Sequence, residues 1–152
     1  MKIITPVIFL LVLLAACQSA TPLPDITAET ESEFTLGFRQ SATITDTSLT
    51  ITLEGVTGDE RCPSEIECAM SGPVSLSLSA QIGDSEPTDI NLQVFTSNNG
   101  RVPDMQFEGI EDRTVFEGYL IRVVSVLPYP AKAFDEIKDS EYRVTFIVSK
   151  AE

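Results

Sequence analysis

Histidine and tryptophan are missing from this 152-residue chain, and lysine and arginine together number only 10 against 23 aspartate and glutamate residues. Without histidine, neither a Ser–His–Asp nor a Cys–His catalytic arrangement can form, and a His-ligated zinc site is excluded. The formal charge of −13 at pH 7 repels nucleic-acid phosphates, so we expect no nucleic-acid partner. Carboxylate catalysis and oxygen-ligated metals remain open. Because no motif indicates a reaction, we expect a protein that is not an enzyme and carries no cofactor.

The first 16 residues have the composition of an export signal. Lys2 precedes an apolar run over residues 3–14, and two alanines follow it. The run is short for a transmembrane helix and contains Pro6. A charged start, a short apolar segment and a small-residue exit are typical of a secretory signal peptide. We therefore predict a signal peptide over residues 1–16.

The exit of this segment, Leu14-Ala15-Ala16-Cys17, resembles the lipobox of bacterial lipoproteins. The resemblance implies cleavage after Ala16 and lipidation of Cys17 by fatty acids such as palmitate, so that the membrane is a partner through the N-terminal lipid. Several acyl chains anchor a protein stably. Because Gln18 is not the aspartate that retains lipoproteins in the inner membrane, the implied location is the outer membrane, facing the periplasm, if the cell has two membranes. Otherwise it is the outer face of the cell membrane.

Residues 17–32 are rich in Ser, Thr, Pro and acidic residues and contain little to bury. This composition predicts a disordered tether between the lipid and a folded domain. The remaining chain, residues 33–152, is long enough for one hydrophobic core, and we predict a single domain there.

Apolar and polar residues alternate through this predicted domain. In VSLSLSA, serines separate Val74, Leu76, Leu78 and Ala80, and strict alternation indicates a strand with one buried and one wet face. We predict strands at residues 34–38, 49–54, 74–80, 90–95, 114–116, 119–127 and 142–148. Turn-forming clusters between these runs favour an all-β fold, an antiparallel β-sandwich (Ig-like or small barrel-like) of about seven or eight strands. We expect one short helix at most, within residues 131–142.

The two remaining cysteines, Cys62 and Cys68, stand in the acidic segment GDERCPSEIEC. In an exported protein two nearby cysteines usually form a disulfide. In the chain-entropy model, a bridge across so short a loop stabilises the fold by roughly 2–2.5 kcal/mol. A redox-active pair is more often spaced C-x-x-C, and a soft-metal site would need further ligands, of which only Met70 is near. We predict a structural disulfide.

The acidic residues around the bridge offer a second interpretation. Asp59, Glu60, Glu65 and Glu67 carry the oxygen ligands that calcium prefers, although their spacing does not match an EF-hand loop. We keep them as candidate metal ligands beside the simpler interpretation, in which they are solvent-exposed loop charges.

Residues 59–68, DERCPSEIEC, and the following SGPVSLSL resemble a motif of uncharacterised exported bacterial proteins: Asp-x-Arg-Cys-Pro, four residues, Cys, then Gly before an alternating strand. The segments FTLGFRQSATI, LTITLEGV, YLIRVVSVLPYP and YRVTFIVS occur where that family has strands and a Pro-x-Pro turn. The resemblance covers residues 34–149. It implies a β-sandwich lipoprotein with a disulfide and supplies no reaction.

Within this motif Asp59 and Arg61 lie two positions apart, so on an extended segment they project to the same side. Arg61 can then pair with Asp59 or donate to loop carbonyls, and either contact would fix the loop before the bridge. Pro63 stiffens the loop, and Gly72 brackets it. We assign Asp59, Arg61, Pro63 and Gly72 to a structural loop.

Rigid sandwiches often present loops for binding. We therefore expect a membrane-tethered binding or interaction module, with another envelope protein as its partner. Met70, Val102, Met105 and Phe107 are candidates for a contact patch, but we expect Met105 and Phe107 to lie in the core. The alternatives are a calcium-binding envelope protein and a carboxylate-based hydrolase of envelope glycans, which would need two carboxylates facing each other in a cleft.

Overall fold

The structure is a computed structural model that describes residues 23–132 and 136–152. The predicted signal peptide and Cys17 lie outside the described residues. Within these described ranges, no helix has both the length and the apolar character needed to cross a membrane.

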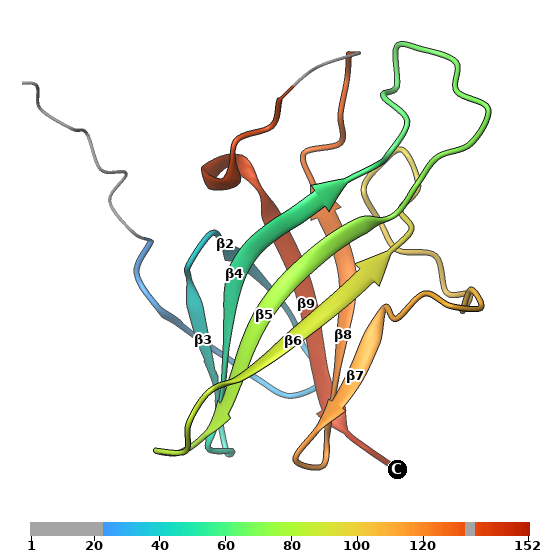
Figure 1. Cartoon of the computed structure of the whole chain (residues 1–152). Helices are drawn as coiled ribbons and strands as arrows, with labels where there is room; N and C mark the ends of the chain where they lie inside the picture. Colours follow the sequence, from blue (N-terminus) through green and yellow to red (C-terminus); the bar gives the residue numbers. More distant parts are fainter. Residues whose placement is uncertain (1–22, 133–135) are drawn as a thin grey trace, which may run out of the picture.

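Two β-sheets pack face to face (Figure 1). The first has the order β1 (Ile26–Ala28), β3 (Ser41–Ile44), β4 (Leu49–Asp59), β5 (Val74–Ile82) and β6 (Thr88–Val94). The second has the order β2 (Glu33–Gly37), β9 (Arg143–Lys150), β8 (Tyr119–Leu127) and β7 (Arg113–Phe116). Neighbouring strands are antiparallel except β1 and β3. The only helical element in the described residues is the 3₁₀ turn η1 (Asp139–Glu141). The predicted all-β sandwich is confirmed.

The alternation in the sequence decides which side of each strand is buried. In β5, Val74, Leu76, Leu78 and Ala80 are at most 1% exposed, and the serines between them are partly exposed on the other face. Strands β4 and β9 follow the same pattern. Side chains from both sheets therefore meet in one core, as expected for packed sheets. The largest fully buried side chains are Leu36, Ile44, Leu49, Ile51, Leu53, Val74, Leu76, Leu78, Leu92, Val94, Ile121 and Phe146.

The folded domain begins earlier than residue 33. Strand β1 lies inside the predicted tether (residues 17–32), where it pairs in parallel with β3 and places Ala28 at 8% exposure. The Gln40 side chain also donates to the Pro24 carbonyl at 2.6 Å. A three-residue strand is too short to produce a readable period of two, so composition alone assigned this segment to the tether.

The connections differ between the two ends of the sandwich. At one end the strands are joined by short turns, such as residues 45–48 and 117–118. At the other, which we call the loop end, lie three long connections: residues 60–73, residues 95–112 and the described parts of the β8–β9 connection, residues 128–132 and 136–142 (Figure 1). We call residues 60–73 the disulfide loop.

Two residues expected in the core lie instead in one of these connections. Met105 is 61% exposed and Phe107 is 39% exposed, so that expectation was wrong. Strand β6 ends at Val94, and the chain beyond it leaves the sheet. Phe107 packs edge-on against Phe95, with ring centroids 5.0 Å apart, rather than against the sandwich core.

Candidate functional site

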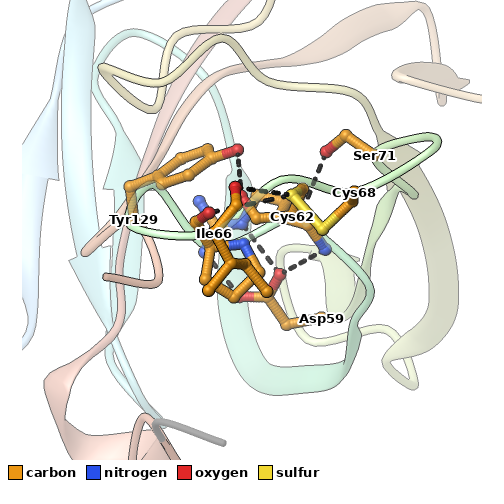
Figure 2. The surroundings of a disulfide bond; sticks show 8 residues. Asp59, Cys62, Ile66, Cys68, Ser71 and Tyr129 are labelled. Carbon is orange, nitrogen blue, oxygen red and sulfur yellow. Dashed lines mark hydrogen bonds and ion pairs between the residues drawn. A yellow bond between two sulfur atoms is a disulfide. The ribbon is translucent and has the colours of Figure 1, made fainter. Parts of the chain in front are cut away.

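The disulfide loop contains the predicted bridge. Cys62 and Cys68 are bonded, with their Cα atoms 5.9 Å apart (Figure 2), a separation ordinary for a disulfide. Cys62 is half-buried, whereas Cys68 is exposed. The bridge therefore joins the base of the loop to its exposed part.

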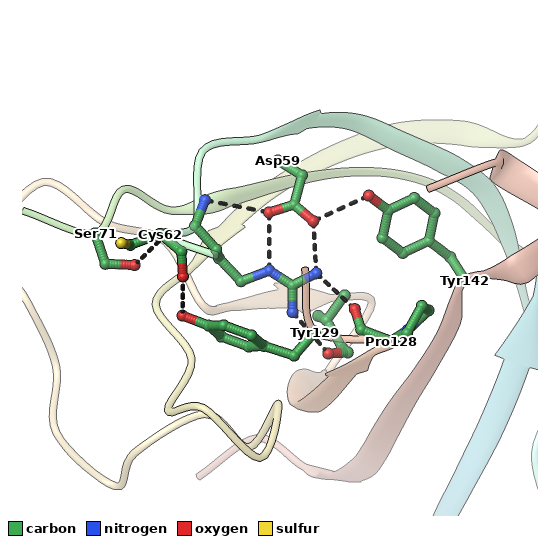
Figure 3. Close-up of polar contacts among 8 residues, drawn as sticks. Asp59, Cys62, Ser71, Pro128, Tyr129 and Tyr142 are labelled. Carbon is green, nitrogen blue, oxygen red and sulfur yellow. Dashed lines mark hydrogen bonds and ion pairs between the residues drawn. The ribbon is translucent and has the colours of Figure 1, made fainter. Parts of the chain in front are cut away.

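Arg61 anchors the base of the loop from inside. Its side chain has no exposed surface, and its guanidinium group forms a bidentate pair with Asp59, the last residue of β4. The Nε–Oδ1 distance is 2.8 Å and the Nη2–Oδ2 distance is 2.5 Å (Figure 3). Bidentate pairs of this kind are strong and directional. The structure thus contains the contact that the two-residue spacing suggested.

The guanidinium group also donates hydrogen bonds to the second sheet and the chain that follows it. Nη1 donates to the carbonyl of Val126 in β8, and Nη2 donates to the carbonyl of Pro128, each at 2.9 Å. The Tyr129 ring lies 5.0 Å from the guanidinium carbon, within range of a cation–π contact. Arg61 therefore connects the end of β4 in one sheet to the end of β8 in the other.

Hydrogen bonds from the β8–β9 connection hold the first half of the disulfide loop. The Tyr129 hydroxyl donates to the Cys62 carbonyl at 2.8 Å. The backbone N–H groups of Ser64 and Glu65 donate to the carbonyls of Pro130 and Ala131, at 3.0 and 2.9 Å. These contacts order a segment that carries no regular secondary structure.

Gly72 closes the second half of the loop. Its N–H donates to the Glu60 carbonyl at 2.8 Å, and a Cβ atom at this position would lie 2.5 Å from the Cβ of Glu60. The Cys62 N–H also donates to the hydroxyl oxygen of Ser71, at 3.0 Å. The two arms of the loop approach so closely here that only glycine fits. Pro63 lies in the first arm, where its carbonyl accepts the Ile66 N–H in a turn.

Asp59 also accepts a hydrogen bond from Tyr142, whose hydroxyl lies 2.9 Å from Oδ2. Burial raises the pKa of Asp59, but the hydrogen bonds and charge of Arg61, with a smaller effect of Tyr142, outweigh burial and leave that pKa below its ordinary value of 3.8. Burial, followed by the Asp59 charge and hydrogen bond, raises the pKa of Tyr142. Asp59 is thus a structural anion, and both of its carboxylate oxygens accept hydrogen bonds.

The acidic candidates for a metal site do not converge. Asp59 faces Arg61, while Glu60, Glu65 and Glu67 are exposed along the loop. In the described part of the chain, no group of three or more His, Cys, Asp or Glu side chains could hold a metal ion. The hollow beside Asp59, lined by Arg61, Pro63 and Tyr142 among others, measures about 230 Å³, which is below the usual size of a small-molecule site.

The exposed part of the loop carries apolar side chains. Met70 is 85% exposed and Ile66 is 42% exposed, although the base of the same loop is rigidly held. The loop therefore presents apolar tips from a fixed frame.

The sequence missed the residues that complete this site. Tyr129 and Tyr142 lie more than sixty positions from the Asp59–Arg61 pair, and the Val126 and Pro128 acceptors are backbone atoms. Neither tyrosine stands in a recognisable spacing with the motif. Only the packing of the two sheets, which brings the end of β8 and the chain after it to the end of β4, places them there.

No protein-family model matches the chain, and neither a curated protein nor a solved structure shows significant similarity to it. A function for this protein therefore has to be inferred from the geometry of the disulfide loop and its surroundings.

Proposed function

We propose that this protein is a membrane-anchored, non-enzymatic lipoprotein of the cell envelope that binds another envelope protein through its loop end. The observation that carries this proposal is the contrast within the disulfide loop. Its base is held by the buried Arg61 and by the bridge, while Met70 and Ile66 are exposed at its tip.

Such a loop is suited to recognition for a physical reason. Association costs free energy when side chains and loops must be ordered, and a segment that is already rigid avoids much of that cost. Exposed methionine adapts to irregular apolar surfaces. The exposed apolar side chains Met105 and Phe107 belong to a second long connection at the same end, so the partner has two candidate contacts on one end of the domain.

The lipobox-like Leu14-Ala15-Ala16-Cys17 supports the anchor. The proposed location is the outer membrane, or the outer face of a single membrane. Its test is direct. A Cys17→Ser variant should lose lipid labelling and leave the membrane fraction. Lipid labelling that persists in Cys17→Ser would refute the anchor.

The partner is tested by photocrosslinking in intact cells. A photoreactive residue replaces Met70 at the tip of the disulfide loop, and a matched exposed position, Glu86 in the β5–β6 turn at the opposite end, serves as control. We expect one defined protein adduct from position 70 and none from position 86. Equal adducts from both positions, or none from position 70 in cells rich in the protein, would refute binding through the loop end.

A further inference from the structure

Strand β6 forms one edge of the five-stranded sheet (Figure 1). Its seven residues pair with β5 in a continuous register without a bulge, and the sequence TDINLQV contains neither lysine nor proline. Exposed edge strands are normally protected by such features, because unpaired backbone groups attract another strand. The edge of β6 lacks these internal protections.

The direction of the free backbone groups follows from one hydrogen bond. The Gln93 N–H leaves the sheet and donates to the Glu111 carbonyl at 2.9 Å. In an antiparallel strand, residues two apart present their N–H and C=O groups to the same side. Asp89 and Asn91 therefore present both backbone groups outward, and both residues are exposed.

The open stretch has a limit at each end. Glu111 already occupies the edge beside Gln93, and Pro87, before the strand, has no N–H to donate. Among the residues that the structure describes, the edge is therefore free over residues 88–92. An approaching strand that fits this edge must be short, or must turn away before Gln93.

We propose that β6 pairs with β6 of a second copy of this chain, antiparallel about a two-fold axis, with Ile90 opposite Ile90 of the other copy. This proposal is independent of the partner proposed for the loop end. In this register Asp89 of each copy lies opposite Asn91 of the other, and each such pair exchanges both backbone hydrogen bonds. The paired stretch begins at Thr88 and ends at Leu92, so it fits the limits of the edge.

The neighbouring registers fit less well. Placing Asp89 opposite Asp89 would set like charges face to face, which destabilises a strand pair. Placing Asn91 opposite Asn91 would run the second strand alongside Gln93, where the segment containing Glu111 already lies. The chosen register sets the carboxylate of Asp89 against the carboxamide of Asn91, which can donate to it, and it does so within the free stretch of the edge.

The side chains on the other face are also complementary. Ile90 lies opposite the buried Leu78 of β5 and is partly buried against the core. In the pair, the two Ile90 side chains meet across the axis and extend both cores into one apolar layer. The formal charge of −13 on each chain opposes association, so we expect added salt to favour the dimer by screening.

Cysteine crosslinking of the full chain in membranes tests the pairing. In a non-hydrogen-bonded pair opposite residues have Cα atoms about 4.5 Å apart, within the range that a disulfide spans. We expect Ile90→Cys to form a covalent dimer under mild oxidation. The matched control is Val115→Cys, on the edge strand β7 of the other sheet and 60% exposed. Crosslinking within a bound pair should exceed this control on the order of a hundredfold.

A charge exchange tests the register. In the Ile90→Cys background, Asn91→Asp sets two aspartates opposite each other and should weaken the dimer roughly tenfold. Adding Asp89→Asn restores one carboxylate and one carboxamide in each pair and should restore crosslinking. All these side chains except Ile90 are exposed, so the fold is expected to tolerate the changes, and circular dichroism will verify it.

Each of three results would overturn the proposal. The first is Ile90→Cys crosslinking no faster than Val115→Cys. The second is an exchanged variant that stays as weak as Asn91→Asp alone, which would exclude this register. The third is an Ile90→Cys adduct with a different protein in place of a second copy, which would show that the edge takes another strand.

Discussion

Replacing the buried Arg61 with alanine should destabilise the domain strongly. The substitution removes the bidentate partner of Asp59 and the donors to the Val126 and Pro128 carbonyls. It leaves the Asp59 carboxylate, whose side chain is only 12% exposed, without a counter-charge. Removing one member of a buried ion pair costs about 3–5 kcal/mol, and native domains have only about 5–15 kcal/mol in total.

Thermal and urea unfolding followed by far-UV circular dichroism measure the effect, since the chain has no tryptophan for fluorescence. For a domain of this length we expect Tm to fall by roughly 10–20 °C. Arg61→Lys keeps the charge but not the planar fork, and should lie between wild type and Arg61→Ala.

Arg101→Ala provides the matched control. Arg101 pairs with Glu33 at 2.9 Å, but the two side chains are 56% and 48% exposed, and exposed pairs contribute about 0–1 kcal/mol. If Arg61→Ala shifted the midpoint no more than Arg101→Ala, the reasoning about the buried arginine would be refuted.

Three further predictions concern the disulfide loop and the Asp59–Tyr142 contact at its base. Serine in place of both bridge cysteines should lower the free energy of unfolding by roughly 2–2.5 kcal/mol, and an unchanged urea midpoint would contradict it. Gly72→Ala should lower the free energy of unfolding by about 1–3 kcal/mol through overpacking. Gly58→Ala, whose Cβ would meet its nearest atom at 3.8 Å, should be nearly neutral. Equal urea midpoints for the two variants would count against the close approach of Gly72 to Glu60. Because the pKa of Asp59 is lowered, this group stabilises the fold above about pH 4, and its contribution is lost as the pH falls. Because the pKa of Tyr142 is raised, this group stabilises the fold below about pH 10, and its contribution is lost as the pH rises. Urea unfolding across pH should show both losses, and Tyr142→Phe should reduce the alkaline one.

The buried faces of the strands were readable from the sequence because their information is local. A strand points successive side chains to opposite faces, so the serine-separated apolar residues of β5 identified its buried side without reference to any partner. The disulfide was predictable for a similar reason, since Cys62 and Cys68 are close in the chain. The spacing of Asp59 and Arg61 also placed them on one side of an extended segment.

The alternation of apolar and polar residues carries no information where strands are very short or where they end. Strand β1 has three residues, and its place is decided by parallel pairing with β3. Met105 and Phe107 are apolar, and apolar character suggested the core, but the chain has left the sheet before it reaches them. Apolar composition cannot distinguish a core residue from one exposed on a long loop.

The sequence by itself determined the class of fold, the inward side of most strands and the bridge, because each depends on residues within one strand or one loop. Only the tertiary structure decided what surrounds Arg61. The two tyrosines and two carbonyls that complete its site come from β8 and from the chain between β8 and β9, and they meet the end of β4 only after the sheets have packed. The free edge of β6 likewise exists only because the sheet ends there. Strand order and sheet packing set both features, and no short-range pattern in the chain specifies either.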